Sequence, residues 1–512
     1  MALVKSQRVG VLRRLPLFLL IWGCVSVSMW IPAIFALVLD DHDTSRSFLY
    51  SGLLGLFLVA TIALAASNRV PRRGTLGQLA VLLGCFTILP IFLAIPFHDA
   101  LGNTTFLNAY FDMVSALTTT GADLFPNPDR LSAPLHLWRA LVGWMGGLLM
   151  WVSAAAILAP LSLGGFEVTA QGQPGRPVSG VAQSEKIDPR GRLIRVTITL
   201  TPIYAGLTAV ICVLLLIAGE RELTAICHAM SIMATSGISP VGGLEGAQAG
   251  FTGEAILFLF LFFALSRLTF STDTATSGFS RLDKDPEFRI GLMIVLGVAV
   301  LLFVRVWAGV SEIGGQMQPL QALNVLWGML FTALSFLTTA GFESANWNDA
   351  QQISGLGTPG LILMGLALVG GGVATTAGGV KLLRVFALYL NGAREIDRLI
   401  HPSSVSGADG GNRRIQSDGA FIAWIFLMLF ALTLAAFNLL LAAMGAGFEQ
   451  AMVLSVASLS TTGPLIELAT DVPIRLIDLS AGAKLTLCAA MVIGRLEALA
   501  IIALITPSLW RD

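Results

Sequence analysis

Long apolar segments recur along the whole chain and are separated by shorter polar stretches. A helix needs about 20 apolar residues to cross the hydrocarbon core of a bilayer. Ten segments reach that length, at about 15–39, 48–66, 76–97, 131–160, 191–218, 251–270, 287–310, 355–390, 416–445 and 480–507. Because lipid offers the backbone no hydrogen-bond partners, each should be a helix. The alternation typical of a membrane barrel is missing, so the pattern predicts an all-α polytopic membrane protein.

Four shorter apolar segments stand between pairs of these spans, near 106–117, 222–233, 322–337 and 448–459. At 1.5 Å per residue they reach only about 18–24 Å, which is less than the membrane core of about 30 Å. We therefore predict four helices that enter the membrane and end inside it.

Each short segment ends in a small, hydroxyl-rich stretch that closes on a glycine, with a threonine two residues before it. The four stretches are Thr118, Thr119, Thr120 and Gly121; Ala234, Thr235, Ser236 and Gly237; Thr338, Thr339, Ala340 and Gly341; and Ser460, Thr461, Thr462 and Gly463. Extended backbone at membrane depth is tolerated where it lines a cavity or is buried in protein. Four such loops in a ring would present backbone carbonyls able to replace a cation's hydration shell. The alternative is four ordinary loops of small residues, but their common register favours a cation filter.

The span at 355–390 is interrupted by residues that disfavour a helix. They are Gly370, Gly371, Gly372, Thr375, Thr376, Gly378 and Gly379, followed by Lys381. Five glycines in ten residues would cost several kcal/mol of helix propensity, so we predict a break in mid-membrane, below the third filter stretch. Either a mobile gating loop or close helix packing through small residues would explain this composition.

Composition agrees with a membrane protein and excludes several functions. Hydrophobic residues make up 55% of the chain and charged residues 12%, with a mean hydropathy of +0.79; soluble proteins carry about 25% charged residues. Five scattered cysteines indicate neither a disulfide framework nor a zinc site. A polytopic membrane enzyme would need clustered His, Asp or Glu inside the spans, and the chain contains no P-loop.

The formal net charge of zero hides a strong asymmetry between the two sides. If both termini are cytosolic, the inner segments hold 23 Lys and Arg and the outer segments five. This distribution is the one that the positive-inside rule expects. Arg495 lies within the last predicted span, where a charge costs about 2.5–3.5 kcal/mol unless it faces water or a partner. Glu497 should point to a different helix face.

Several motifs resemble one known family. They are Gly143-Trp-Met-Gly-Gly147, Ile157-Leu-Ala-Pro-Leu161, the stretch 370–381 and Gly494-Arg-Leu-Glu497, together with the four filter-like loops. With these motifs the chain resembles the Trk/Ktr/HKT superfamily of K⁺ transporters, and most of all its bacterial TrkH-type membrane subunit. The resemblance implies four helix–pore-loop–helix repeats around a central pore plus an N-terminal helix pair. The divisions are 1–75, 76–160, 191–270, 287–390 and 416–507.

The resemblance also implies K⁺ uptake across the bacterial inner membrane, with the filter carbonyls as K⁺ ligands and with 370–381 and Arg495 controlling the pore. It implies a homodimer surrounded by lipid, a cytosolic TrkA-type nucleotide-binding ring, no cofactor apart from K⁺ and no nucleic acid partner. Asp123 and Glu343 follow their filter glycines by two residues, where small or polar residues are usual. A Na⁺-permeable relative therefore stays open, as does symport with H⁺ or Na⁺.

Overall fold

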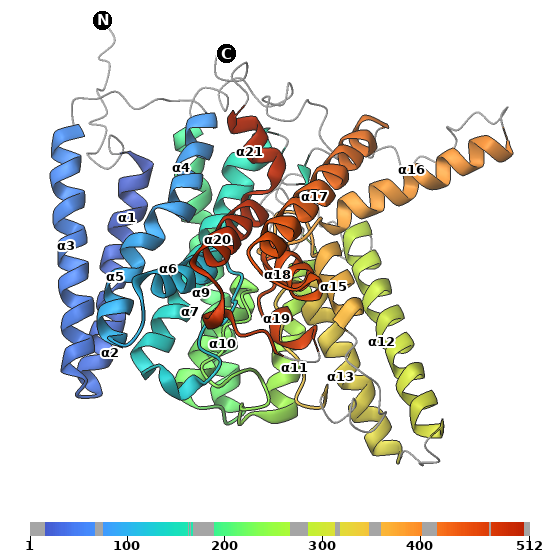
Figure 1. Cartoon of the computed structure of the whole chain (residues 1–512), viewed down its shortest axis with the longest axis horizontal. Coiled ribbons are helices and arrows are strands. Elements are labelled where there is room, and N and C mark those ends of the chain that lie inside the picture. The colour runs from blue at the N-terminus through green and yellow to red at the C-terminus, as the bar shows by residue number, and fades with distance from the viewer. Residues whose placement is uncertain are drawn as a thin grey trace, which may run out of the picture.

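The computed structural model describes residues 16–66, 75–161, 163, 165–166, 189–266, 285–312, 318–347, 360–401, 417–470 and 473–505. Regular structure within these residues is helical throughout (Figure 1). The prediction of an all-α membrane protein is thereby confirmed.

Eight helical segments of the described residues are long and apolar enough to cross a membrane. They comprise α1 (Leu17–Ser28) with α2 (Trp30–Val38), α3 (His42–Ala66), α4 (Thr75–Thr87) with α5 (Leu89–Leu101), α7 (Ala133–Ser153) with the turns that continue it to Leu161, α9 (Pro189–Ile217), α12 (Pro286–Glu312), α13 (Pro319–Leu337) and α17 (Ser417–Ala443).

Three of the ten predicted spans are not among these eight segments. They are α11 (Gly250–Leu261) with a 3₁₀ turn at Phe262–Leu265, α15 (Gly360–Val369) with α16 (Leu382–Ile400), and α20 (Ala481–Leu496) with α21 (Ala498–Ile505). The α15–α16 division falls where the glycines predict a break. Glu497 divides the last span, because its φ of 65° is incompatible with a continuing helix.

The short helices are α6 (Phe106–Leu117), α10 (Glu222–Ala234), α13 and α18 (Phe448–Leu459). Each ends within one residue of the predicted end. The third differs from expectation at its start, because α13 begins three residues earlier and its 19 residues make it the one short segment that could span a membrane by length.

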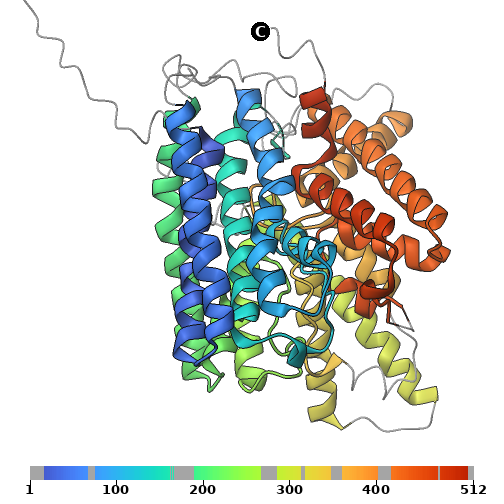
Figure 2. The same cartoon turned by 60° about the vertical axis from the view of Figure 1, so that its left-hand side comes forward.

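These helices are arranged around the middle of the molecule. Helices α1 and α3 lie at one edge and α12 with α17 toward the other, with α6, α10 and α18 between them (Figures 1 and 2). Helix α6 packs against α5, α7 and α20, and α18 against α17 and α20. The start of α1 and the end of α21 lie toward the same side, as an even number of crossings requires.

Two glycines allow a close approach to the ends of short helices. A Cβ on Gly146 of α7 would lie 1.9 Å from the carbonyl oxygen of Leu117, the last residue of α6. A Cβ on Gly494 of α20 would lie 2.3 Å from the oxygen of Leu459, the last residue of α18. Helix α7 therefore packs closely against the end of α6, and α20 packs in the same way against the end of α18.

We predict that Gly146→Ala lowers the melting temperature of the purified protein in detergent, because the added carbon meets a backbone oxygen that has no room to move. Gly206→Ala in α9 is the matched control, since its Cβ would meet nothing within 4 Å. That change should leave stability equal or raise it by up to about 1 kcal/mol of helix propensity. Equal melting temperatures for the two variants would contradict the packing.

Candidate functional site

Each short helix is followed, one or two residues after its end, by a threonine with the same unusual backbone conformation. Thr119, Thr235, Thr339 and Thr461 have φ values of 56°, 49°, 57° and 54°. A β-branched residue in the left-handed region is a genuine outlier and is kept only where the surroundings impose it. Four copies at the predicted position show that the four stretches share one local structure.

The residue after each threonine makes the same hydrogen bond. Its amide donates to the carbonyl of the residue five positions earlier, with distances of 2.9, 3.0, 2.9 and 2.8 Å for Thr120 to Ser115, Ser236 to Ser231, Ala340 to Ser335 and Thr462 to Ala457. A trans peptide is planar, so the threonine carbonyl points opposite to that amide. All four threonine carbonyls are therefore turned away from their own helices.

The four glycines are neighbours in order around a ring. A Cβ on Gly121 would lie 1.7 Å from the oxygen of Ser236, and one on Gly237 would lie 2.5 Å from that of Ala340. A Cβ on Gly341 would lie 2.9 Å from Cγ of Pro464, and one on Gly463 would lie 2.1 Å from the amide nitrogen of Ala122. The structure thus brings together all four stretches that the sequence singles out.

The fourth stretch differs from the other three. Gly121, Gly237 and Gly341 have positive φ, but Gly463 does not. Its amide donates to the carbonyl of Thr120 at 2.6 Å, and its own carbonyl accepts from Ile466 at 2.9 Å. The chain then turns into α19 (Leu465–Leu468), so the equivalence that the repeated sequence suggests is not complete.

The non-helical residues 370–381 lie against the threonine ring. The Gly378 amide donates to Oγ1 of Thr339 at 2.7 Å, and Oγ1 of Thr235 bonds Oγ1 of Thr376 at 3.2 Å. A Cβ on Gly378 would lie 2.1 Å from the oxygen of Ser460. This segment therefore contacts the second, third and fourth stretches at once.

Arg495 is the positive group that holds this segment. Its Nη1 donates to the carbonyl of Thr376 at 2.6 Å, and its side chain is buried. It does not pair with Glu497, whose Oε2 accepts from Nη2 of Arg384 at 2.5 Å. Arg384 also stacks on the Phe426 ring, with its guanidinium carbon 3.6 Å from the centroid. The prediction that Arg495 and Glu497 face different ways agrees with this geometry.

Carboxylates follow three of the four stretches, namely those of Asp123, Glu343 and Glu467. Glu343 and Glu467 interact electrostatically with each other, and Glu467 also with Asp123. Burial raises the pKa of both glutamates to about 7; like charges from Glu245 and Glu467 add to the rise at Glu343, and at Glu467 the charge of Asp123 adds to it while Arg139 opposes it. Within the described residues no group of three His, Cys, Asp or Glu is arranged to hold a metal ion.

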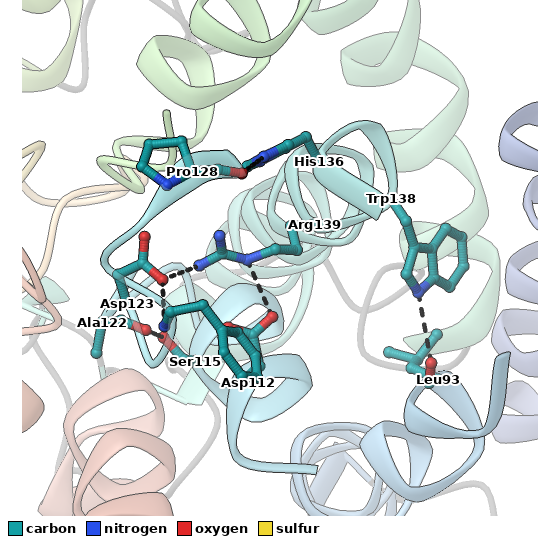
Figure 3. Close-up of polar contacts among 10 residues, drawn as sticks. Leu93, Asp112, Ser115, Ala122, Asp123, Pro128, His136, Trp138 and Arg139 are labelled. Carbon is teal, nitrogen blue, oxygen red and sulfur yellow. Dashed lines mark hydrogen bonds and ion pairs between the residues drawn. The ribbon is translucent and has the colours of Figure 1, made fainter. Parts of the chain in front are cut away.

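Two charged groups behind the stretches were missed by the sequence reasoning. Glu254 of α11, 3% exposed, accepts hydrogen bonds from Nε1 of Trp327, Oγ of Ser344 and the Ala345 amide at 2.8, 2.8 and 2.7 Å. Arg139 of α7 pairs with Asp112 and Asp123 (Figure 3). Glu254 and Arg139 are charges inside predicted spans, and that alone marks them as candidates.

Fold and site together define the class: a multi-pass helical membrane protein in which four segments that follow helices meet near its centre. Residues 254–511 match the TrkH family model, a cation transport protein. The Trk system potassium uptake proteins TrkH of Salmonella typhimurium (strain LT2) and Escherichia coli (strain K12) are each 30% identical, covering 95% of this chain and 96% of the relative. The crystal structure of the potassium transporter TrkH from Vibrio parahaemolyticus superposes with a TM-score of 0.77 at 26% identity, over 96% of this chain and 98% of that chain. This chain belongs to the TrkH family, and the resemblance read from its motifs is confirmed.

We predict that Glu254→Gln lowers the free energy of unfolding by about 1–3 kcal/mol, because the amide leaves at least one of three buried donors without an acceptor. Thermal unfolding in detergent measures the change. The control is Glu449→Gln, which removes an exposed carboxylate and should leave the melting temperature unchanged. A Glu254 variant as stable as that control would show that the three contacts contribute nothing.

Proposed function

We propose that this protein takes up K⁺ across the bacterial inner membrane through the ring formed by its four re-entrant stretches. The observation that carries the proposal is the fourfold repetition of one backbone arrangement, with left-handed threonines whose carbonyls turn away from their helices and glycines that are successive neighbours. Relatives with 30% identity over almost the whole chain carry the name potassium uptake protein.

In this proposal the K⁺ ligands are backbone carbonyls of the filter stretches that end at Gly121, Gly237, Gly341 and Gly463. Carbonyl dipoles can replace water around a K⁺ ion without placing a full charge in the membrane. Each short helix also ends at its stretch, so its negative dipole end favours a cation there. The fourth stretch contributes less symmetrically, because the Gly463 carbonyl already accepts one hydrogen bond.

Residues 370–381 act as the gate. They touch three of the four stretches from one side, so a cation leaving the ring on that side meets them first. Arg495 places a fixed positive charge on the same segment through the Thr376 carbonyl. Opening then requires that the Gly378 and Arg495 contacts break together, and Lys381, whose Nζ donates to the Ala377 carbonyl, marks the end of the moving part.

The relatives also indicate the partners. Their names place them in a Trk system, which supports a transporter that works with further components. We extend this to a homodimer with a cytosolic TrkA-type nucleotide-binding ring and to cytosolic termini. The basic stretches expected to face such a ring are 161–195, 267–289 and 381–415. Most of the first two lies outside the described residues, as does 402–415, whereas the described part of the third contains α16.

Liposomes that contain the purified chain should show a reversal potential set by the K⁺ gradient and only weakly by Na⁺. In Gly341→Ser the K⁺ preference should fall by at least about tenfold, or uptake should be lost, with folded protein still in the membrane. The physical reasons are the φ of 77° and a Cβ position 2.9 Å from Pro464. The control Gly447→Ser makes the same change at the N-cap of α18, where an added Cβ would meet nothing within 4 Å. It should keep both the K⁺ preference and the uptake.

Unchanged K⁺ over Na⁺ discrimination in the Gly341 variant would remove that glycine from the filter. Equal permeability to both ions in the unmodified chain would instead favour the Na⁺-permeable alternative.

Deletion of Val373–Ala377 and the change Arg495→Ala should each raise K⁺ flux per folded molecule. A K⁺ ion that passes about 6 Å from the Arg495 guanidinium would be repelled by about 3 kcal/mol at an effective dielectric of 20. Each 1.4 kcal/mol removed from that barrier should raise the flux about tenfold. Arg495→Lys keeps the charge and should change flux less. Arg305→Ala, at an exposed site on α12, is the control and should have no effect. Wild-type flux in both the deletion and Arg495→Ala would exclude this segment as the gate.

A further inference from the structure

A buried charged group lies directly behind the first filter stretch. Nε of Arg139 on α7 is 3.0 Å from Oδ2 of Asp112 on α6, and its Nη2 is 3.1 Å from Oδ1 of Asp123. The side chains of Arg139 and Asp112 are 3% and 1% exposed, whereas that of Asp123 is 27% exposed. One guanidinium thus joins the short helix to the segment that follows Gly121.

The contacts of Asp123 use only one of its two carboxylate oxygens. Oδ1 accepts from Arg139 and, at 2.9 Å, from the Phe125 amide. The other oxygen points away from the guanidinium (Figure 3). Asp123 is therefore held on one side while its free oxygen remains on the partly exposed side, two residues past the filter glycine.

The helix that carries Arg139 is itself fixed on both sides. The Nε2 of His136 bonds the carbonyl of Pro128 at 2.9 Å, and Nε1 of Trp138 donates to the carbonyl of Leu93 at 3.4 Å (Figure 3). A separate bond ties α6 to the segment after Gly121, since the hydroxyl of Ser115 donates to the carbonyl of Ala122 at 3.0 Å. The direction of the guanidinium is consequently set by contacts outside the filter stretch.

The charge count shows why a merely structural role is a poor explanation. A buried ion pair rarely adds stability over apolar side chains of the same volume, so packing does not require Arg139 and Asp112. Two carboxylates share one guanidinium, so the group keeps one net negative charge. Only Asp123 is exposed enough to present that charge outside the protein.

We propose that Arg139 is a positioning residue that holds the Asp123 carboxylate at the outer mouth of the filter and so sets the apparent affinity for the entering monovalent cation. Asp112 completes the arrangement by fixing the other edge of the guanidinium. This inference rests on the proposed function, because it assumes that cations enter past Gly121.

The test measures KM and maximal rate of K⁺ uptake into liposomes, per folded molecule of the full chain. Asp123→Asn retains the hydrogen-bonding shape and removes the charge, and should raise KM about fivefold while the maximal rate stays within about twofold. The paired change Asp112→Leu with Arg139→Met removes both buried charges together, so no unpaired charge remains inside. It should raise KM by a similar factor, because the Asp123 carboxylate is no longer held.

The decisive variant combines all three changes. If Arg139 acts through Asp123, adding Asp123→Asn to the paired change should alter KM by less than about twofold, because coupled residues are not additive. The proposal would be overturned if the KM increases of Asp123→Asn and of the paired change multiplied in the triple variant. It would also be overturned if the paired variant kept the wild-type KM and lost only maximal rate. In either case Arg139 would be a structural residue.

Arg139→Lys decides the matter if the paired variant does not fold. Lysine keeps the charge but lacks the fork that reaches two carboxylates, so its KM should fall between those of the wild type and Asp123→Asn. A wild-type KM in that variant overturns the proposal. If the unmodified chain carries Na⁺ and not K⁺, the proposed function fails by itself, and the same comparison of KM values is made with Na⁺.

Discussion

Four helices of this protein end in its buried interior, where water cannot satisfy their last carbonyls or the amides beyond them. In each of them a threonine turns to positive φ and the next amide returns to a carbonyl near the helix end. That one hydrogen bond has two consequences. It satisfies the helix end within the protein, and it turns the threonine carbonyl away from its own helix. The glycines can then approach to distances that no Cβ would permit.

Buried charged side chains hold this backbone in place. Glu254 gathers three donors around the segment after the third stretch, and Arg139 joins two carboxylates around the first. Arg495 and Arg384 do the same on the other side of the ring, through the Thr376 carbonyl and through Glu497. A buried charged side chain cannot move far from the groups that it contacts, because it would then lose its compensating partners in a low dielectric.

The four repeats are alike in their short helices and differ in the segments beyond the filter glycines. Gly463 turns into α19, and the Pro464 ring lies where side chains on Gly237 and Gly341 would be. The segment 370–381 comes from one repeat only, yet it contacts three stretches. The contacts of that segment therefore make the ring asymmetric, although its four stretches share one backbone arrangement.

The sequence by itself determined the class of fold, the positions where the four short helices end and the break at 370–381. These depend on local properties, namely apolar length, glycine content and a repeated register, each of which is a property of a single segment. The tertiary structure alone decided which residues meet: that Arg495 bonds Thr376 while Glu497 pairs with Arg384, that Arg139 bridges Asp112 and Asp123, and that the last span divides at Glu497. Such partners lie up to 119 positions apart in the sequence. A charged residue within a predicted span indicates that it needs a partner, but not which one. Which partner it finds depends on the packing of the whole chain, because only that packing brings the two groups to hydrogen-bonding distance.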